Sequence, residues 1–217
     1  MQQPEASPSA TWRLRAAGLR LWPDAKPDVP PIEHGWVHVG NERLLRRLIG
    51  ERRPRIAIEL GSWLGLCTRL MLEAAPELAL FAIDLWDSCA LLGRSELRAQ
   101  YERDASAMTL LTNGTGAILQ CARAPTPARD LARHDAADLH ATFLANCWSE
   151  RHRLYPLRMG TLDGLRAVSS LGAAVDLIYV DADHSEPAVA AELRLIGAAR
   201  AWRASVARAI TIHPVRR

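Results

Sequence analysis

Four groups of acidic or small residues, each at the end of a short apolar run, are the first residues of this chain that point to chemistry. They are Glu59 with the turn to Gly65, Asp84 with Trp86, Gly160 with Thr161, and Asp181 with Asp183 and His184. Carboxylates accept hydrogen bonds from hydroxyl and amino groups, and an imidazole takes up a proton near neutral pH. If the apolar runs are parallel strands, these groups meet at the sheet edge where open α/β folds bind ligands.

The turn after the first apolar run has glycines at a spacing that suits a closely approaching ligand. Residues 59–65 read Glu-Leu-Gly-Ser-Trp-Leu-Gly. Glycine permits a sharp bend and a close backbone approach, and a helix after the turn would aim free amides at an anionic group. The dinucleotide fingerprint requires Gly-x-Gly-x-x-Gly, and Trp63 interrupts it, which argues against that class of site.

Asp84 stands 19 residues after Gly65, at the end of the second apolar run. There a carboxylate can accept hydrogen bonds from both hydroxyls of a ribose. A glycine turn with a capping aspartate would look the same, so each element alone leaves both interpretations open. The combination at this spacing favours a nucleoside-type ligand.

Hydrophobic spacing predicts the elements that must position these residues. Short apolar runs predict strands buried on both faces of a parallel sheet, at 55–60, 78–83, 153–159 and 175–180. Helical spacing predicts helices at 41–50, 66–75, 139–148, 162–171 and 187–201. Asn41 is the predicted N-cap and Gly50 the predicted end of the first helix, and Pro156 marks the third strand as an edge or a bend. Strands alternating with helices predict a parallel α/β sheet.

The domain organisation follows from changes in composition along the chain. Residues 1–31 are rich in proline and predict an irregular tail with one short helix at 10–20. Residues 32–217 are the predicted domain, with a loop or insertion at 103–135.

Charge and composition narrow the classes of partner. Net charge is +3 over 217 residues, and the basic side chains are scattered, which argues against a nucleic-acid partner. Neither a signal peptide nor a stretch of about 20 apolar residues is visible, so we expect a cytoplasmic protein with no membrane partner. The four cysteines form no Cys-x-x-Cys pair, which predicts reduced thiols and no zinc site. Formation of a homo-oligomer is left open by the sequence.

Three segments of the chain resemble a known family. IAIELGSWLGLCTRLM and FAIDLW, at 56–71 and 81–86, resemble the first two cofactor motifs of class I S-adenosylmethionine-dependent methyltransferases. VDLIYVDADHSEPAVAAEL, at 175–193, resembles a subgroup with Asp-x-x-His after the fourth strand, which includes antibiotic and sugar O-methyltransferase-like proteins. The resemblance covers residues 33–195. It implies a Rossmann-like, doubly wound, mostly parallel sheet in a three-layer α/β/α domain, S-adenosylmethionine as cofactor, and a small-molecule acceptor.

The same resemblance implies roles for residues of the first two motifs. Glu59 would fix the methionine amino group, directly or through water. Gly61 and Gly65, with Ser62 between them, would pass their backbone around the methionine part of the cofactor. Asp84 would hold the ribose.

Further roles are implied for residues after the second, third and fourth strands. Trp86 would pack on the adenine edge, although a core tryptophan explains it nearly as well. Gly160 and Thr161 would lie near the adenine. Asp181 would face the sulfonium end of the cofactor or bind a divalent cation.

Transfer of a methyl group to a hydroxyl also requires loss of the hydroxyl proton, to a general base or with the help of a metal. His184 is the best base in the sequence, three residues after Asp181. Asp181, Asp183 and His184 could instead bind Mg²⁺. A structural alternative makes Asp183 or Ser185 an N-cap and His184 a surface loop residue.

The C-terminal end departs from the family. A class I methyltransferase has seven strands, whereas four are predicted here before the helix at 187–201, with 206–212 as one more. An Ala/Arg-rich segment replaces the family's Gly-containing turn and acidic pair. We therefore expect a sheet incomplete at its C-terminal strands, as in a truncated or frame-shifted reading frame.

Two other functions stay open from the sequence. A degenerate methyltransferase could bind the cofactor without catalysing transfer, given the unusual C-terminal end. An NAD-dependent oxidoreductase would share the sheet, but the third glycine of its fingerprint is missing. It also lacks a Tyr-x-x-x-Lys pair, because Lys26 is the only lysine.

Overall fold

The computed structural model describes residues 18–19, 21–29, 37, 39–86, 139–199, 202 and 205–208. The predicted insertion at 103–135 lies outside these residues, as does nearly all of the predicted helix at 10–20. The division into a tail at 1–31 and a domain at 32–217 therefore stays a prediction.

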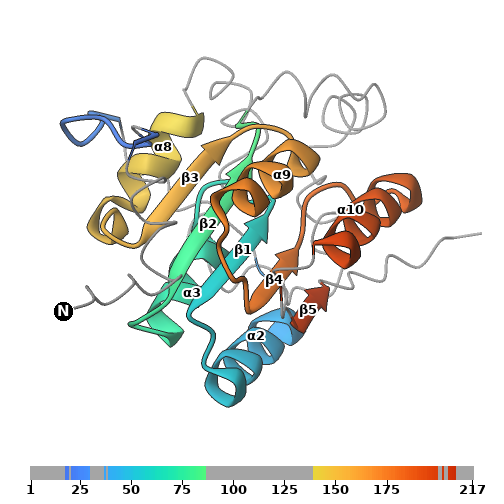
Figure 1. The fold of residues 1–217 in the computed structure, drawn as a ribbon. Coiled ribbons are helices and arrows are strands. Elements are labelled where there is room, and N and C mark those ends of the chain that lie inside the picture. The colour runs from blue at the N-terminus through green and yellow to red at the C-terminus, as the bar shows by residue number, and fades with distance from the viewer. Residues whose placement is uncertain are drawn as a thin grey trace, which may run out of the picture.

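A five-stranded parallel sheet forms the centre of the molecule, in the order β3-β2-β1-β4-β5 (Figure 1). The strands are β1 (Ile56–Leu60), β2 (Ala79–Asp84), β3 (Leu154–Arg158), β4 (Leu177–Val180) and β5 (Ser205–Arg208). The helices are α2 (Val39–Arg52), α3 (Leu66–Ala74), α8 (Leu139–Asn146), α9 (Thr161–Leu171) and α10 (Glu186–Ala198), with a 3-10 turn at Trp148–Glu150. The predicted parallel α/β sheet is confirmed.

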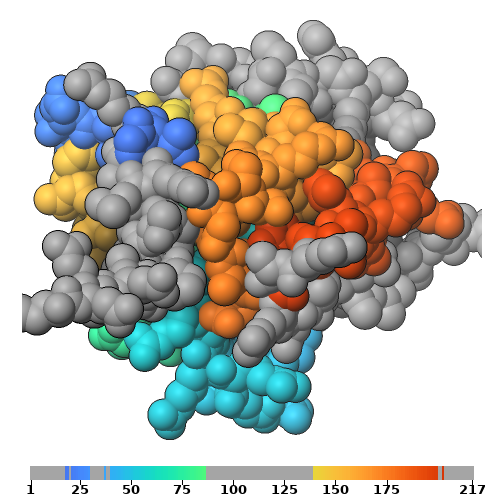
Figure 2. Space-filling view, viewed as in Figure 1, coloured from blue at the N-terminus to red at the C-terminus, as the bar shows by residue number. Residues whose placement is uncertain are grey.

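Side chains alternate between the two faces of the sheet and build two cores. On one face, alternate strand residues such as Leu80 pack with α2, α3 and α8. On the other face, the intervening residues such as Phe81 pack with α9 and α10. Helices α9 and α10 lie side by side on this second face, where Figure 2 shows them in orange and red. The molecule thus has the three α/β/α layers of a Rossmann-like fold.

The first helix differs from its prediction at both ends. Helix α2 begins at Val39 rather than at Asn41, and it continues past Gly50 to Arg52. Its end is set instead by Arg53, which has a left-handed φ of 46° and donates its amide to the Ile49 carbonyl. Pro54 follows and disfavours helix in the residue before it. A proline therefore outweighs a glycine that the helix tolerates.

β3 is an edge strand, as Pro156 predicted, because it pairs only with β2 among the described strands. The indole of Trp22 donates to the Leu154 carbonyl at 2.9 Å, on this strand. Its ring also makes an edge contact with Trp148, with the centroids 5.8 Å apart. The segment 21–29 thus supplies a side chain that satisfies a backbone acceptor of the edge strand.

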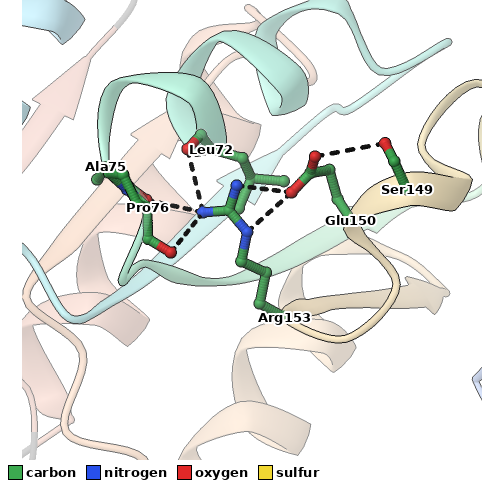
Figure 3. A network of polar contacts seen from close by, with 6 residues as sticks. All are labelled: Leu72, Ala75, Pro76, Ser149, Glu150 and Arg153. Atoms are coloured by element: carbon green, nitrogen blue, oxygen red, sulfur yellow. Dashed lines mark hydrogen bonds and ion pairs between the residues drawn. The ribbon is translucent and has the colours of Figure 1, made fainter.

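Arg153 joins the amino end of β3 to the end of α3 (Figure 3). Its Nη1 donates to the carbonyls of Leu72, Ala75 and Pro76 at 3.1, 2.8 and 3.0 Å. Its guanidinium also pairs with Glu150, with Nη2 at 2.6 Å from Oε2. One cation therefore adds a charged donor to carbonyls at the end of a helix, where those of Leu72 and Ala75 also accept the backbone amides of Ala75 and Leu78.

Two further expectations can be compared with the described residues. None of the helices within the described ranges is both long and apolar enough to cross a membrane. Cys67 and Cys147 are free and buried, as reduced thiols would be.

Candidate active site

The strand register brings the predicted site residues to one edge of the sheet. Leu60 of β1 pairs with Ile83 of β2 on one side and with Val180 of β4 on the other. The backbone continues this arrangement beyond the strands, because the Gly61 amide donates to the Ile83 carbonyl and the Asp181 amide donates to the Leu60 carbonyl, both at 2.9 Å. The loops after β1, β2 and β4 therefore lie next to one another.

Glu59 is a fully buried carboxyl on the face of β1 that α3 covers. Thr68 of α3 donates its hydroxyl to Oε2 at 2.5 Å. Oε1 and the buried Ser62 hydroxyl form no hydrogen bond of normal distance and angle within the described chain, although the Ser62 hydroxyl and the Cys67 thiol lie close enough to the carboxyl to favour its charged form. Burial raises the pKa of Glu59 to about 7, even though the Thr68 hydrogen bond favours the charged form. An unsatisfied carboxyl oxygen in this position is suited to an incoming donor.

Gly61 brings the loop after β1 against the loop after β4. It has a left-handed φ of 86°, and a Cβ at this position would overlap the backbone carbonyl of Asp181. Only glycine satisfies both constraints. Gly65 has the same φ and precedes α3, but a Cβ there would overlap the Cys147 thiol. Both glycines are thus required locally, the first by the site loops and the second by packing near α8.

Asp84 holds the loops after β1 and β2 in place. Its Oδ2 accepts the Trp63 amide at 2.9 Å, and its Oδ1 accepts the Trp86 amide at 2.7 Å. Burial raises the pKa of Asp84, while these backbone hydrogen bonds favour its ionised form. The structure therefore gives Asp84 the capping function considered above. It does not test the ribose function, because each carboxylate oxygen can accept a further hydrogen bond.

Trp86 also connects the loops after β1 and β2, and its ring lies in the core. Its indole donates to the Trp63 carbonyl at 2.6 Å, and its ring packs against Phe143 and His140 with centroids 4.6 and 4.8 Å away. Trp86 is buried, whereas Leu85, directly before it, is 50% exposed. Trp86 is therefore a core tryptophan, which was the alternative to a role at the adenine edge.

Gly160 and Thr161 lie where β3 passes into α9, as predicted. Gly160 precedes the helix and a Cβ there would meet nothing, so this position is open. Thr161 lies near Glu192 of α10 and helps to lower the pKa of that carboxyl, although burial raises it overall.

Asp181 and His184 come together after β4. His184 Nε2 lies 3.4 Å from Asp181 Oδ1, with the imidazole 45% exposed and the carboxylate 19% exposed. The other oxygen, Oδ2, accepts the hydroxyl of Tyr179 at 3.0 Å. Ser185, and not Asp183, is the N-cap residue of α10, and Asp183 Oδ1 accepts the amide of Ser185 at 2.9 Å in the turn before the helix.

The predicted magnesium ligands do not form a metal cluster. Nowhere in the described chain do three His, Cys, Asp or Glu side chains gather in a geometry that could hold a metal ion. Asp183 accepts a hydrogen bond from a backbone amide, and both oxygens of Asp181 face protein partners. This donor set does not fit Mg²⁺, which needs several oxygen ligands.

Sequence reasoning missed three residues that the structure brings to this edge. Thr68 and Tyr179 contact the carboxyls of Glu59 and Asp181, and Leu85 offers exposed apolar surface. A hydroxyl within an otherwise apolar run, as in Leu-Ile-Tyr-Val at 177–180, was the available signal for Tyr179.

Comparisons with known proteins show which family the chain resembles. A family model described as a methyltransferase domain matches residues 58–204, well over half of the chain. A search of curated proteins finds no match. Among solved structures, the chain is similar to an O-methyltransferase from Bacillus cereus in complex with SAH, at 16% identity and TM-score 0.36, covering 88% of this chain and 62% of that one. It is also similar to TomG of Streptomyces achromogenes, an O-methyltransferase of tomaymycin synthesis in complex with SAM.

The match to TomG has 19% identity and TM-score 0.38, and covers 89% of this chain and 61% of that one. The chain therefore spans less than two thirds of the length of either protein. The family match, in contrast, includes the turn after β1, Asp84 and the loop after β4. The resemblance in the sequence is thus confirmed, and the chain belongs to a family of methyltransferase domains.

Proposed function

We propose that this chain binds S-adenosylmethionine at the carboxyl edge of β1, β2 and β4 and transfers a methyl group to the hydroxyl of a small molecule. The observation that carries the proposal is the buried carboxyl of Glu59, one oxygen of which forms no well-directed hydrogen bond within the described chain, although the hydroxyl of Ser62 lies near it. A buried acceptor without a donor is costly, and the ammonium group of a methionine moiety would supply that donor. Membership of a methyltransferase-domain family supports the same ligand.

The remaining residues of the edge fit the other parts of such a cofactor. Asp84 can accept ribose hydroxyls in addition to its two backbone amides. Leu85 offers an exposed apolar surface for the base, and Trp86 holds the loop after β2 to the loop after β1 through its hydrogen bond to the Trp63 carbonyl. Gly160 and Thr161, between β3 and α9, would border the same region from the end of β3.

Bound S-adenosylmethionine would supply an activated methyl group, so the protein must align the acceptor, exclude water and remove a proton. His184 is partly exposed and paired with Asp181, which suits a general base that is oriented by a carboxylate. No step is assigned to a metal, because the described side chains do not form a magnesium site.

Two further parts of the proposal concern the surroundings of the protein. A small-molecule acceptor is favoured over a nucleic acid by the low net charge of +3. A cytoplasmic location is proposed because the free, buried thiols of Cys67 and Cys147 suit a reducing compartment.

Calorimetric titration with S-adenosylmethionine and S-adenosylhomocysteine tests the cofactor site. We expect micromolar binding by the unaltered chain and a loss of at least tenfold in Glu59→Gln, which keeps the side-chain shape but removes the charge. Glu51→Gln is the matched control, since Glu51 is an exposed residue of α2 paired with Arg47. Absence of binding by a protein with a cooperative unfolding transition would overturn the proposal. Binding without transfer to any hydroxyl acceptor would indicate the degenerate, non-catalytic alternative.

A further inference from the structure

Tyr179 is a buried polar residue for which the cofactor site gives no explanation. It lies on β4 in register with Glu59 of β1 and faces the same side of the sheet. Its ring belongs to the core that α3 covers, where a phenylalanine would supply the same ring without a polar atom. The hydroxyl therefore needs a reason of its own.

The hydroxyl of Tyr179 reaches the carboxylate that faces His184. It donates to Asp181 Oδ2 at 3.0 Å, while Oδ1 of the same carboxylate lies 3.4 Å from His184 Nε2. Asp181 therefore bridges a buried phenol and a partly exposed imidazole. Burial, followed by the charge of Asp181, raises the pKa of Tyr179 far above its ordinary value, so the hydroxyl stays a donor at any working pH.

This arrangement separates a rigid end from an exposed end. Tyr179 is fixed by the strand and the core around it, whereas His184 lies in the loop before α10 with nearly half of its side chain exposed. A hydrogen bond to one oxygen of a carboxylate restricts its rotamers, and the position of the second oxygen, which contacts His184, is then restricted as well. Holding a general base in position raises the rate of the reaction, because a displacement of about 1 Å can lower the rate about a hundredfold.

We propose that Tyr179 is a positioning residue whose hydroxyl anchors Asp181, so that Asp181 orients the His184 imidazole toward the acceptor hydroxyl. This inference rests on the proposed function only for the last step. The anchoring itself is a property of the protein without ligands. Tyr179 touches no reacting atom and acts through Asp181.

The test measures the order of the His184 ring in the full chain by ¹³C relaxation of labelled histidines, with the resonance assigned through His184→Gln. Tyr179→Phe keeps the ring and removes only the hydroxyl. We expect the order parameter of the imidazole to fall clearly in this variant, from the range of rigid groups toward that of flexible ones. Asp181→Ala should produce the same fall, and Tyr179→Phe should add nothing in that background, which a merely structural role would not predict.

Tyr155→Phe on β3 is the matched control and should leave the His184 ring unchanged. An unchanged ring in Tyr179→Phe, an equal change in Tyr155→Phe, or additive effects with Asp181→Ala would overturn the inference. Titration of the same variants with S-adenosylhomocysteine separates it from the proposed function, because Tyr179→Phe should keep its affinity within about twofold. With an acceptor that the unaltered chain methylates, we expect Tyr179→Phe to show a ten- to hundredfold lower kcat at a nearly unchanged KM.

Discussion

Glu59 and Asp84 illustrate how surroundings give two carboxyls of one sheet edge different properties. Glu59 is fully buried and Asp84 is partly buried, and both have a raised pKa with burial as the largest cause. Asp84 accepts two backbone amides, which keep its loops together. Glu59 accepts one side-chain hydroxyl and keeps one oxygen unsatisfied. The sequence placed both residues at the edge, but it could not distinguish these environments, because the partners come from distant turns.

Glu59 should make folding less stable as the pH rises. Its pKa is raised from 4.5 to about 7 in the folded chain, so the folded state holds the proton more tightly than the unfolded state. The stabilisation is complete below about pH 4.5 and is lost as the pH rises through about 7, by up to about 3 kcal/mol. Urea unfolding at pH 5 and pH 8 should therefore show a smaller loss of stability between the two pH values in Glu59→Gln.

The control for this prediction is Glu51→Gln, because Glu51 is exposed and should leave the pH dependence unchanged. The same pH dependence in Glu59→Gln as in the unaltered chain would contradict the assignment of a raised pKa to this carboxyl. Higher stability of Glu59→Gln at pH 8 together with weaker cofactor binding would indicate that the site keeps a destabilising charge for its ligand.

At the scale of secondary structure, periodicity predicted which elements exist better than where they end. The strand at 55–60 corresponds to β1 at Ile56–Leu60, and the helix at 162–171 to α9 at Thr161–Leu171. Buried apolar runs are a strong signal of this kind. The predicted C-terminal end of α2 was wrong because Arg53 and Pro54, rather than Gly50, end the helix. The contact from Arg153 to the end of α3 spans about 80 residues and has no local signal.

Arg153→Ala should destabilise the fold by about 2–3 kcal/mol. The variant removes a charged donor from three carbonyls at the end of α3, of which those of Leu72 and Ala75 keep a backbone amide, and leaves Glu150 without its partner (Figure 3). Hydrogen bonds to charged groups in such partly buried places are worth more than surface ion pairs. Urea denaturation of Arg153→Ala is the measurement, and Arg153→Lys should recover only part of the loss, because an ammonium lacks the planar fork of donors.

Arg166→Ala provides the comparison for this prediction. Arg166 pairs with Asp163 on the surface of α9, with 61% and 74% of the two side chains exposed. Its loss should cost no more than about 0.5 kcal/mol. Equal effects of the two substitutions would show that Arg153 contributes no more than a surface ion pair.

At the scale of the whole molecule, the parallel sheet separates two kinds of residue. The carboxyl edge holds the residues proposed to bind and react, whereas the amino ends of β2 and β3 hold Arg153 and its carbonyl partners. The alternation of strands with helices in the sequence predicted this separation, because the carboxyl ends of all strands in a parallel sheet lie at the same edge. The sequence alone did not contain the strand order, in which β1 lies between β2 and β4 and brings their loops together.

Hydrogen exchange with and without S-adenosylhomocysteine tests this division of the molecule. Ligand binding should slow exchange in three separate loops, at 61–65, 85–86 and 181–184, because they are adjacent only through the register of β1 with β2 and β4. The turn at 75–78, on the other side of the sheet, should keep its exchange rates, since no ligand contact is expected there. Glu59→Gln at the same ligand concentration should show little protection and serves as the control. Protection confined to the turn at 75–78, or spread evenly over both ends, would mean that the ligand binds elsewhere or acts by general stabilisation, and the carboxyl edge would then lose its proposed role.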